Sequence, residues 1–214
     1  HPEYGRMPFL KMIHPLNNLG GFLDFNPRLL KRMRLMGYYD TMKAYGALDG
    51  IRYTFTRIGE VRVSPVARRF MRRVATFDAE TIRRVALHSS QQMYAPLISA
   101  LEAETPLRKL DWKEVWLRGI ELAAQAMEFR EDAIYDPCLL AERILKFADS
   151  GERVETLNEK RIAETAKEGS RALLGLLVRA LRDQGAFPGD CLRALAEHPV
   201  ETAAALALDC TREM

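Results

Sequence analysis

Signals that start helices recur along this sequence, and they constrain the fold more than any other feature. Each pairs a side chain that can cap a helix with a following run of apolar residues at helical spacing. These starts lie at Asn26-Pro27, Ser64-Pro65, Asp111 and Asp136-Pro137. Short segments rich in glycine and proline separate the runs. The sequence therefore predicts a mainly α protein, either an antiparallel helical bundle or an irregular helical array.

One segment near the front departs from the helical pattern. Ile51, Tyr53 and Phe55 alternate with polar residues, and Gly59-Glu60 offers a turn into residues 61–63. Alternation of this kind is typical of strands. We therefore predict one small β-hairpin near residues 51–63. Before it we expect two short helices, one ending at Gly37 and one over residues 38–48.

The predicted elements suggest three parts. Residues 1–26 form an irregular, extended N-terminal arm, because prolines and glycines interrupt it. Residues 27–75 form a small helix-helix-hairpin-helix module, whose last helix starts at Ser64-Pro65. Residues 76–214 form a helical body, in which Asp78 caps the first helix. Three cysteines without a close pair indicate reduced thiols.

The arm is unusually apolar for a segment without periodicity. A disordered tail would be polar and charged, so we expect these side chains to be covered either by the chain's own domain or by a neighbouring molecule, and we favour the neighbour. The candidate anchoring residues are Phe9, Leu10, Ile13, Leu16, Phe22 and Phe25. The chain begins at His1, and we expect that an upstream segment was removed, by cleavage of a presequence or by trimming for expression.

Positive charge is concentrated in the front of the chain. Residues 1–84 contain 16 Lys and Arg against 7 Asp and Glu, although the whole chain carries a net charge of only +3. Six arginines on two successive predicted helices are candidates for binding an acidic or phosphate-bearing partner. They are Arg68, Arg69, Arg72, Arg73, Arg83 and Arg84. The alternative is that they form the solvated polar face of an amphipathic helix.

Residues 27–75 also resemble the winged-helix module of bacterial regulators. The resemblance lies in the order of two helices, a hairpin and the helix VSPVARRFMRRV. It implies nucleic-acid binding through the second helix. That helix, YYDTMKAYGAL, contains one lysine and one aspartate and no Arg, Asn or Gln to contact base edges. Nucleic acid is therefore the second choice of partner, after other protein subunits.

The residue types used in catalysis do not form a familiar pattern. We find no histidine pair with metal-ligand spacing and no phosphate-binding glycine loop, so we expect no catalytic residues, no metal and no cofactor. Trp112 and Trp116 lie one turn apart, which favours packing in the core. No run approaches the ~20 apolar residues of a membrane-spanning helix.

These observations favour a non-catalytic structural or accessory subunit of a larger intracellular complex. Its expected location is the mitochondrion, given the basic front half, the first residue and the cysteine pattern. Two alternatives stay open: a nucleic-acid-binding protein with a winged-helix-like N-terminal module, and an enzyme with an unrecognised site between helices, which could include His88.

Overall fold

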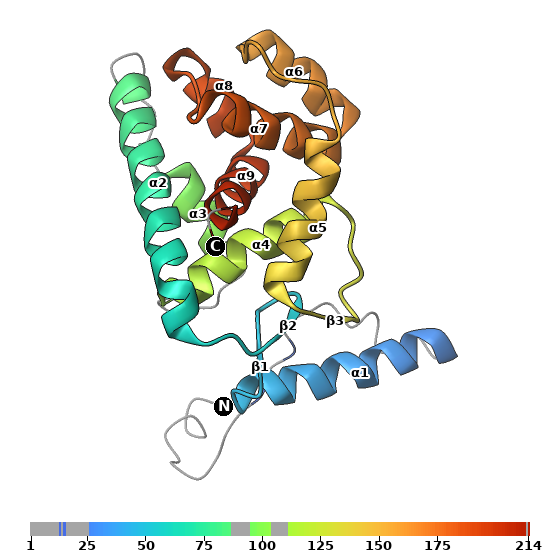
Figure 1. Cartoon of the computed structure of the whole chain (residues 1–214). Helices are drawn as coiled ribbons and strands as arrows, with labels where there is room; N and C mark the ends of the chain where they lie inside the picture. The colour runs from blue at the N-terminus through green and yellow to red at the C-terminus, as the bar shows by residue number, and fades with distance from the viewer. Residues whose placement is uncertain (1–12, 14, 16–25, 87–94, 104–110, 213) are drawn as a thin grey trace. The chain divides into compact units, whose positions relative to one another are not determined.

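The computed structural model of the chain describes residues 13, 15, 26–86, 95–103, 111–212 and 214 (Figure 1). The protein is mainly α-helical with a small sheet, as the sequence predicted. The described residues form two compact units. The small unit takes in residues 26–57 and 130–135, and the large unit takes in the described residues of 58–129 and 136–214. The boundary suggested by the sequence at residues 75 and 76 lies inside a helix.

The small unit consists of one helix and three short strands. Helix α1 spans Pro27–Ala44, and strands β1, β2 and β3 span Leu48–Asp49, Thr54–Thr56 and Ile134–Tyr135. The β1 strand pairs antiparallel with β2, in the register Leu48 to Thr56. The β2 strand pairs parallel with β3, in the register Thr54 to Ile134. A segment 80 residues further along the chain thus completes the sheet.

Two predictions for this region were wrong. The predicted break at Gly37 does not occur, and α1 continues through it to Ala44. The hairpin is formed by β1 and β2, whereas the predicted second strand, residues 61–63, lies in the next helix. The two helices and wing that carried the winged-helix resemblance are therefore not present in residues 26–86. Asn26 does cap α1 as predicted, since its side chain accepts a hydrogen bond from the Arg28 N–H.

The large unit contains the remaining described helices. Its first half has α2 at Glu60–Ala86, α3 at Pro96–Glu102, α4 at Trp112–Ala126 and α5 at Pro137–Asp149. Its second half has α6 at Glu159–Glu168, α7 at Ser170–Gln184, the 3-10 turn η2 at Gly189–Cys191, α8 at Leu192–Ala196 and α9 at Pro199–Thr211. The predicted caps Asp111 and Asp136 start α4 and α5.

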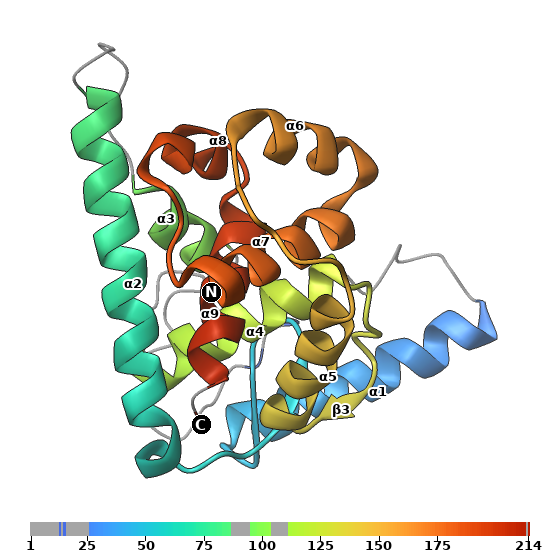
Figure 2. The ribbon, with the colours of Figure 1, turned by 45° about the horizontal axis from the view of Figure 1, so that its top comes forward.

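Helix α2 corrects the predicted start at Ser64-Pro65. It runs as one continuous helix from Glu60, with Pro65 inside it (Figure 2). The predicted cap Asp78 also lies inside α2. Its carboxylate accepts hydrogen bonds of 3.0 Å from both Leu97 and Ile98 N–H groups, so it caps α3 instead. Burial raises the pKa of Asp78, and these two N–H groups lower it in part.

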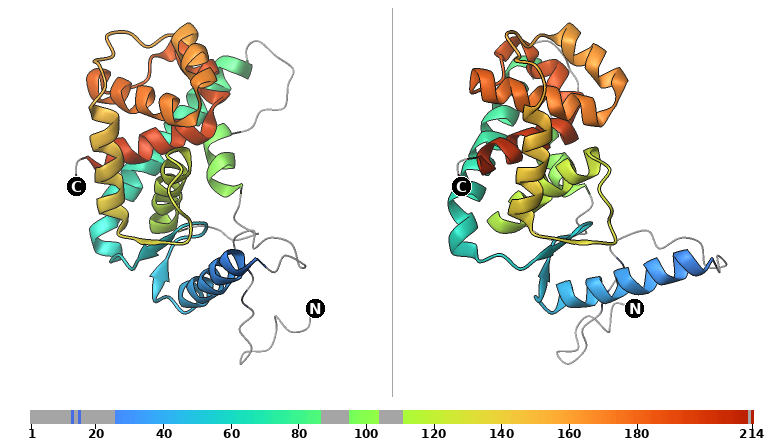
Figure 3. Two further views of the ribbon diagram at one scale, coloured as in Figure 1. Left: turned by 90° about the vertical axis from the view of Figure 1, so that its right-hand side faces the viewer. Right: turned by 45° about the vertical axis from the view of Figure 1, so that its right-hand side comes forward.

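The core of the large unit is built around α9. This helix contacts α2, α3, α4, α5, α7 and α8, and Figure 3 shows α6 and α7 packed at one end of the unit. The Trp116 indole N–H donates to Thr211 Oγ1 over 3.1 Å, which ties α4 to α9 inside the core. Gly119 lets the two helices approach closely, because an added Cβ would lie 2.5 Å from the Ala207 Cβ.

Within the described ranges, none of the helices is both long enough and apolar enough to cross a membrane.

Candidate functional site

The structure separates the six arginines that the sequence grouped. Arg68 and Arg72 are exposed on α2, and Arg69 is half-buried. Arg73 forms an ion pair with Asp209 on α9 and donates to the Gly185 carbonyl over 3.2 Å. Arg73 therefore fastens α2 to the C-terminal part of the large unit. Its main contact is with the chain itself.

The two arginines at the end of α2 also have partners in the chain. Arg83 and Arg84 both donate to the same Glu80 oxygen, each over 2.7 Å. Arg84 further donates to the Gly189 carbonyl over 3.0 Å. These contacts lower the pKa of Glu80, chiefly through the hydrogen bond from Arg83. Of the six predicted partner-binding arginines, Arg68, Arg72 and Arg83 are exposed, and the ion pair of Arg83 with Glu80 lies within α2 and joins no second helix.

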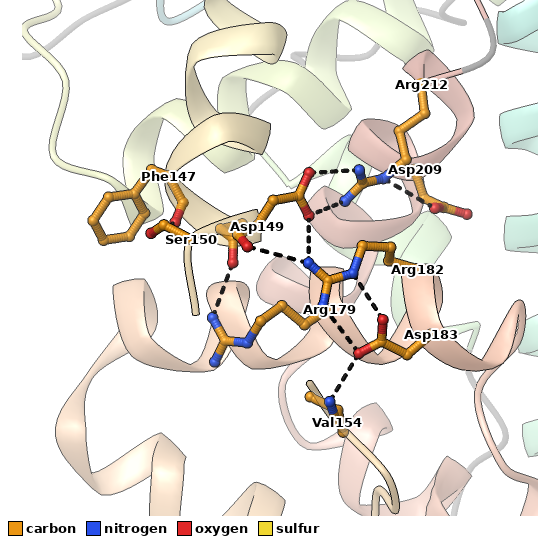
Figure 4. Close-up of polar contacts among 10 residues, drawn as sticks. Phe147, Asp149, Ser150, Val154, Arg179, Arg182, Asp183, Asp209 and Arg212 are labelled. Atoms are coloured by element: carbon orange, nitrogen blue, oxygen red, sulfur yellow. Dashed lines mark hydrogen bonds and ion pairs between the residues drawn. The ribbon is translucent and has the colours of Figure 1, made fainter. Parts of the chain in front are cut away.

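A second group of charged side chains joins α5, α7 and α9, and it is drawn in Figure 4. Arg212 donates to both carboxylate oxygens of Asp149, each over 2.7 Å. Arg182 donates to both oxygens of Asp183, over 2.8 and 3.1 Å, and reaches the Asp149 carbonyl over 3.2 Å. We call this group the arginine–aspartate network. Arginine is suited to it because its planar guanidinium matches a carboxylate in a two-bonded geometry.

The arginine–aspartate network also satisfies the end of α5. Arg179 donates a hydrogen bond to the Ala148 carbonyl over 3.1 Å, and Arg182 donates one to the carbonyl of the next residue, Asp149. The last carbonyls of a helix have no partner within it, and they carry its partial negative charge. Arg212 lowers the pKa of Asp149, and Arg182 together with the Val154 N–H lowers that of Asp183 to about 2. Ionised carboxylates held this way stabilise the packing of helices, and they are poor proton donors or acceptors near neutral pH.

The described cysteines are equally unsuited to chemistry. Cys138, Cys191 and Cys210 are all free and buried. Burial raises the pKa of each thiol, to about 11 for Cys191. A thiolate is the reactive form, so these thiols are held in the unreactive state. Among the residues that the structure describes, no three His, Cys, Asp or Glu side chains are grouped so that they could hold a metal ion.

The small unit presents a different surface along α1. Of its 18 residues, only Met36, Tyr39 and Asp40 are buried. The exposed residues of this helix include three cations and two large side chains of apolar character. We call these five residues the α1 face: Arg28, Leu30, Lys31, Arg34 and Tyr38.

The helix itself supplies no exposed carboxylate to balance the cations of the α1 face. The only carboxylate in the sequence of α1 is that of Asp40, which is 3% exposed and lies 3.8 Å from the Lys43 ammonium. Leu30 and Tyr38 are 43% and 56% exposed, so the surface is apolar as well as cationic. Such a surface suits a partner that offers negative charge together with groups that pack on an aromatic ring.

Ion pairs fix α1 to the sheet of the small unit. The Glu131 carboxylate forms an ion pair with Arg32 of α1 at 2.6 Å. It forms a second ion pair at 2.7 Å with Arg52, which lies in the segment before β2. Since Arg32 is tied down in this way, it points away from the α1 face, and the cations that remain exposed are the three named above. Glu131 precedes β3, so the segment of residues 130–135 positions the helix that carries the candidate site.

No family model, no curated protein and no solved structure matches this chain.

Sequence reasoning placed the candidate surfaces elsewhere. Most of the N-terminal arm lies outside the described residues, including Phe9, Leu10, Leu16, Phe22 and Phe25, and so does His88. Ile13, which is described, is 38% exposed. The α1 face was missed, because the predicted break at Gly37 divided it between two short helices. The signal was present in RLLKRMR, residues 28–34, which contains four cations and no carboxylate.

Trp112 was predicted in the core together with Trp116. Only Trp116 is buried there, whereas Trp112 is 54% exposed at the first position of α4.

Proposed function

We propose that this chain is a non-catalytic subunit of a larger assembly, and that it attaches to a negatively charged partner through the α1 face. The observation that carries the proposal is the exposed, cationic and partly apolar surface formed by Arg28, Leu30, Lys31, Arg34 and Tyr38. Tyrosine and arginine are enriched at interfaces, where their large side chains contribute much of the binding free energy.

The large unit supports a scaffold role. Its charged side chains hold helices to one another, as in the contacts of Arg212 with Asp149 and of Arg73 with Asp209. The apolar N-terminal arm would add a second attachment, and its six named residues are retained in this proposal on their sequence alone. At ~25 cal/mol per Å², burying several large apolar side chains would contribute several kcal/mol to association.

The compartment is part of the same proposal. Three free, buried cysteines suit a reducing compartment. The basic front half favours the mitochondrion, where the assembly would be sought first.

Sedimentation of a native mitochondrial extract through a density gradient tests the proposal. The wild-type chain should migrate with a particle much heavier than its own 24.4 kDa. The variant Arg28→Glu/Lys31→Glu/Arg34→Glu should migrate as a light species. Glutamates near the start of a helix favour it, so α1 should stay folded in this variant, as circular dichroism would check.

A matched control separates the α1 face from net charge. Lys160→Glu/Lys167→Glu/Arg193→Glu changes the same number of charges at exposed positions of the large unit. This control should stay in the heavy fraction. Release of both triple variants, or of neither, would contradict the proposed role of α1. A wild-type chain that is absent from the mitochondrial fraction would refute the proposed location.

A further inference from the structure

The α1 face combines cations on successive turns with an exposed aromatic ring. From this combination we infer that its partner is single-stranded nucleic acid. Phosphates would lie against Arg28, Lys31 and Arg34, and a base would stack on Tyr38. The inference rests on the proposed function and specifies the chemistry of its partner.

The spacing of the three cations suits a chain of phosphates. They are three residues apart, so each lies about 4.5 Å further along the helix axis than the one before. All three are exposed, and α1 contains no acidic residue on that side, because Asp40 is buried against Lys43. A row of cations without carboxylates neutralises a polyanion over several consecutive charges, and it releases the counterions that the polyanion had condensed.

Tyr38 provides an exposed aromatic ring on which a base can stack. It lies one helical turn beyond Arg34 and is 56% exposed. The ring of the buried Tyr39 lies 6.0 Å away at an angle of 56°, so an aromatic contact supports Tyr38 from the protein side. An exposed ring next to a row of cations is the arrangement on which bases stack in proteins that bind single strands.

The residue types on α1 also indicate which nucleic acid is bound. Stacking on Tyr38 requires a base that is free of its duplex partner, which favours a single strand. The sequence of α1 contains no Asn or Gln, so the side chains that most often pair with adenine edges are missing from it. Binding should therefore depend weakly on base sequence.

Other anionic partners would contact only some of the groups on the α1 face. A membrane surface would need a continuous apolar stripe, whereas Leu30 and Tyr38 are two turns apart with Arg34 between them. An acidic protein would pair with the three cations, whereas a single strand also offers an unpaired base next to each phosphate for stacking on Tyr38. The base stack is what distinguishes a single strand.

Fluorescence anisotropy with the full chain tests the inference. The probes are labelled mixed-sequence RNA and DNA single strands of about 20 nucleotides, titrated between about 50 and 200 mM salt. The wild-type chain should bind, and the logarithm of its affinity should fall with the logarithm of salt with a slope of about −2 for three phosphate contacts. The triple α1 variant should lose binding, and the matched α6–α8 control should keep it. Binding of either strand in this manner supports the inference.

Two tyrosine variants separate stacking from charge. Tyr38→Ala should weaken binding roughly 5- to 100-fold without changing the salt slope. Tyr38→Phe keeps the ring and should bind like the wild type. The inference is overturned if Tyr38→Ala binds as tightly as the wild type. It is also overturned if a duplex or poly-glutamate competes as well as an unlabelled single strand.

The two proposals fail in different ways. If the α1 variant leaves the heavy gradient fraction but no oligonucleotide binds, the partner is a protein, and only the nucleic-acid inference falls. If oligonucleotides bind through the α1 face but the variant stays in the heavy fraction, the assembly does not depend on α1, and the proposed function falls while the nucleic-acid inference stands.

Discussion

Gly119 provides the sharpest test of how closely α4 and α9 pack. Glycine inside a helix normally reduces stability, and replacing it with alanine adds about 1 kcal/mol of helix propensity. At Gly119 the new methyl carbon would lie 2.5 Å from the Ala207 Cβ and 3.0 Å from the Phe70 ring. Carbon atoms in contact prefer a separation of about 3.5–4.0 Å, so α4 and α9 would have to move apart by about 1 Å.

The expected result of Gly119→Ala follows from these two opposing effects. Overpacking a well-packed core costs about 1–3 kcal/mol, and the contact with Ala207 joins two helices whose backbones cannot easily yield. We therefore expect a net loss of about 1–2 kcal/mol in the free energy of unfolding. For a unit of this size, that corresponds to a fall of roughly 2–8 °C in Tm. Thermal and urea unfolding followed by circular dichroism would measure it.

Two further variants make the test specific. A Cβ added at Gly175 in α7 would meet only the guanidinium end of Arg179, at 3.3 Å. Because one side chain has to shift by only a few tenths of an ångström, Gly175→Ala should be neutral or stabilising. In the double variant Gly119→Ala/Ala207→Gly the methyl group changes sides, so stability should recover beyond the sum of the single effects. The reasoning is refuted if Gly119→Ala is as stable as Gly175→Ala.

Two other predictions concern the large unit. Arg182 and the Val154 N–H lower the pKa of Asp183 from 3.8 to about 2, so ionised Asp183 stabilises the fold above about pH 4, and this contribution is lost as the pH falls towards about 2. The urea midpoint should therefore fall more steeply between about pH 5 and pH 2 in the wild type than in Asp183→Asn, and equal slopes would contradict this. Trp112→Phe should leave emission that acrylamide quenches poorly, since Trp116 is fully buried, and Trp116→Phe should leave emission that is quenched easily. Similar quenching of the two variants would contradict the prediction, because it would mean that Trp112 is shielded from solvent.

Local signals in the large unit predicted the starts of α4 and α5. Asp111 caps α4 with a capping box, and Asp136 and Asn158 cap α5 and α6. At Gly185 the backbone is left-handed with φ 76°, and α7 ends before this glycine. In each case the decisive interaction lies within a few residues of the side chain that makes it, so the sequence contains it.

The wrong predictions came from patterns that two structures share. Val61 and Val63 alternate with polar neighbours, as in a strand. Val63 is also followed by Val66, Ala67 and Phe70 at helical spacing. All four of these residues, from Val63 to Phe70, are buried in α2. Over three residues the two periods cannot be told apart. Tertiary packing decided the outcome.

Long-range pairing was beyond the reach of the sequence. Nothing near Ile134 and Tyr135 indicates that they form the third strand with β2. In the same way, helical spacing places Arg69 and Arg73 on one side of α2, but it does not reveal that Asp209 lies opposite Arg73. The predicted arginine surface was divided by partners that are more than a hundred residues away.

The exposed positive charges of α1 destabilise the helix that carries them. Arg28 lies in the first turn, where the partial positive charge of the helix disfavours a cation by about 0.3–1 kcal/mol. Like charges three apart, as Arg28 with Lys31 and Lys31 with Arg34, add a few tenths of a kcal/mol each. The remaining basic residue of this stretch, Arg32, is compensated by Glu131. An anion bound along the α1 face would offset these unfavourable terms by its attraction to the same cations, so the energetic balance of the helix favours a negatively charged partner.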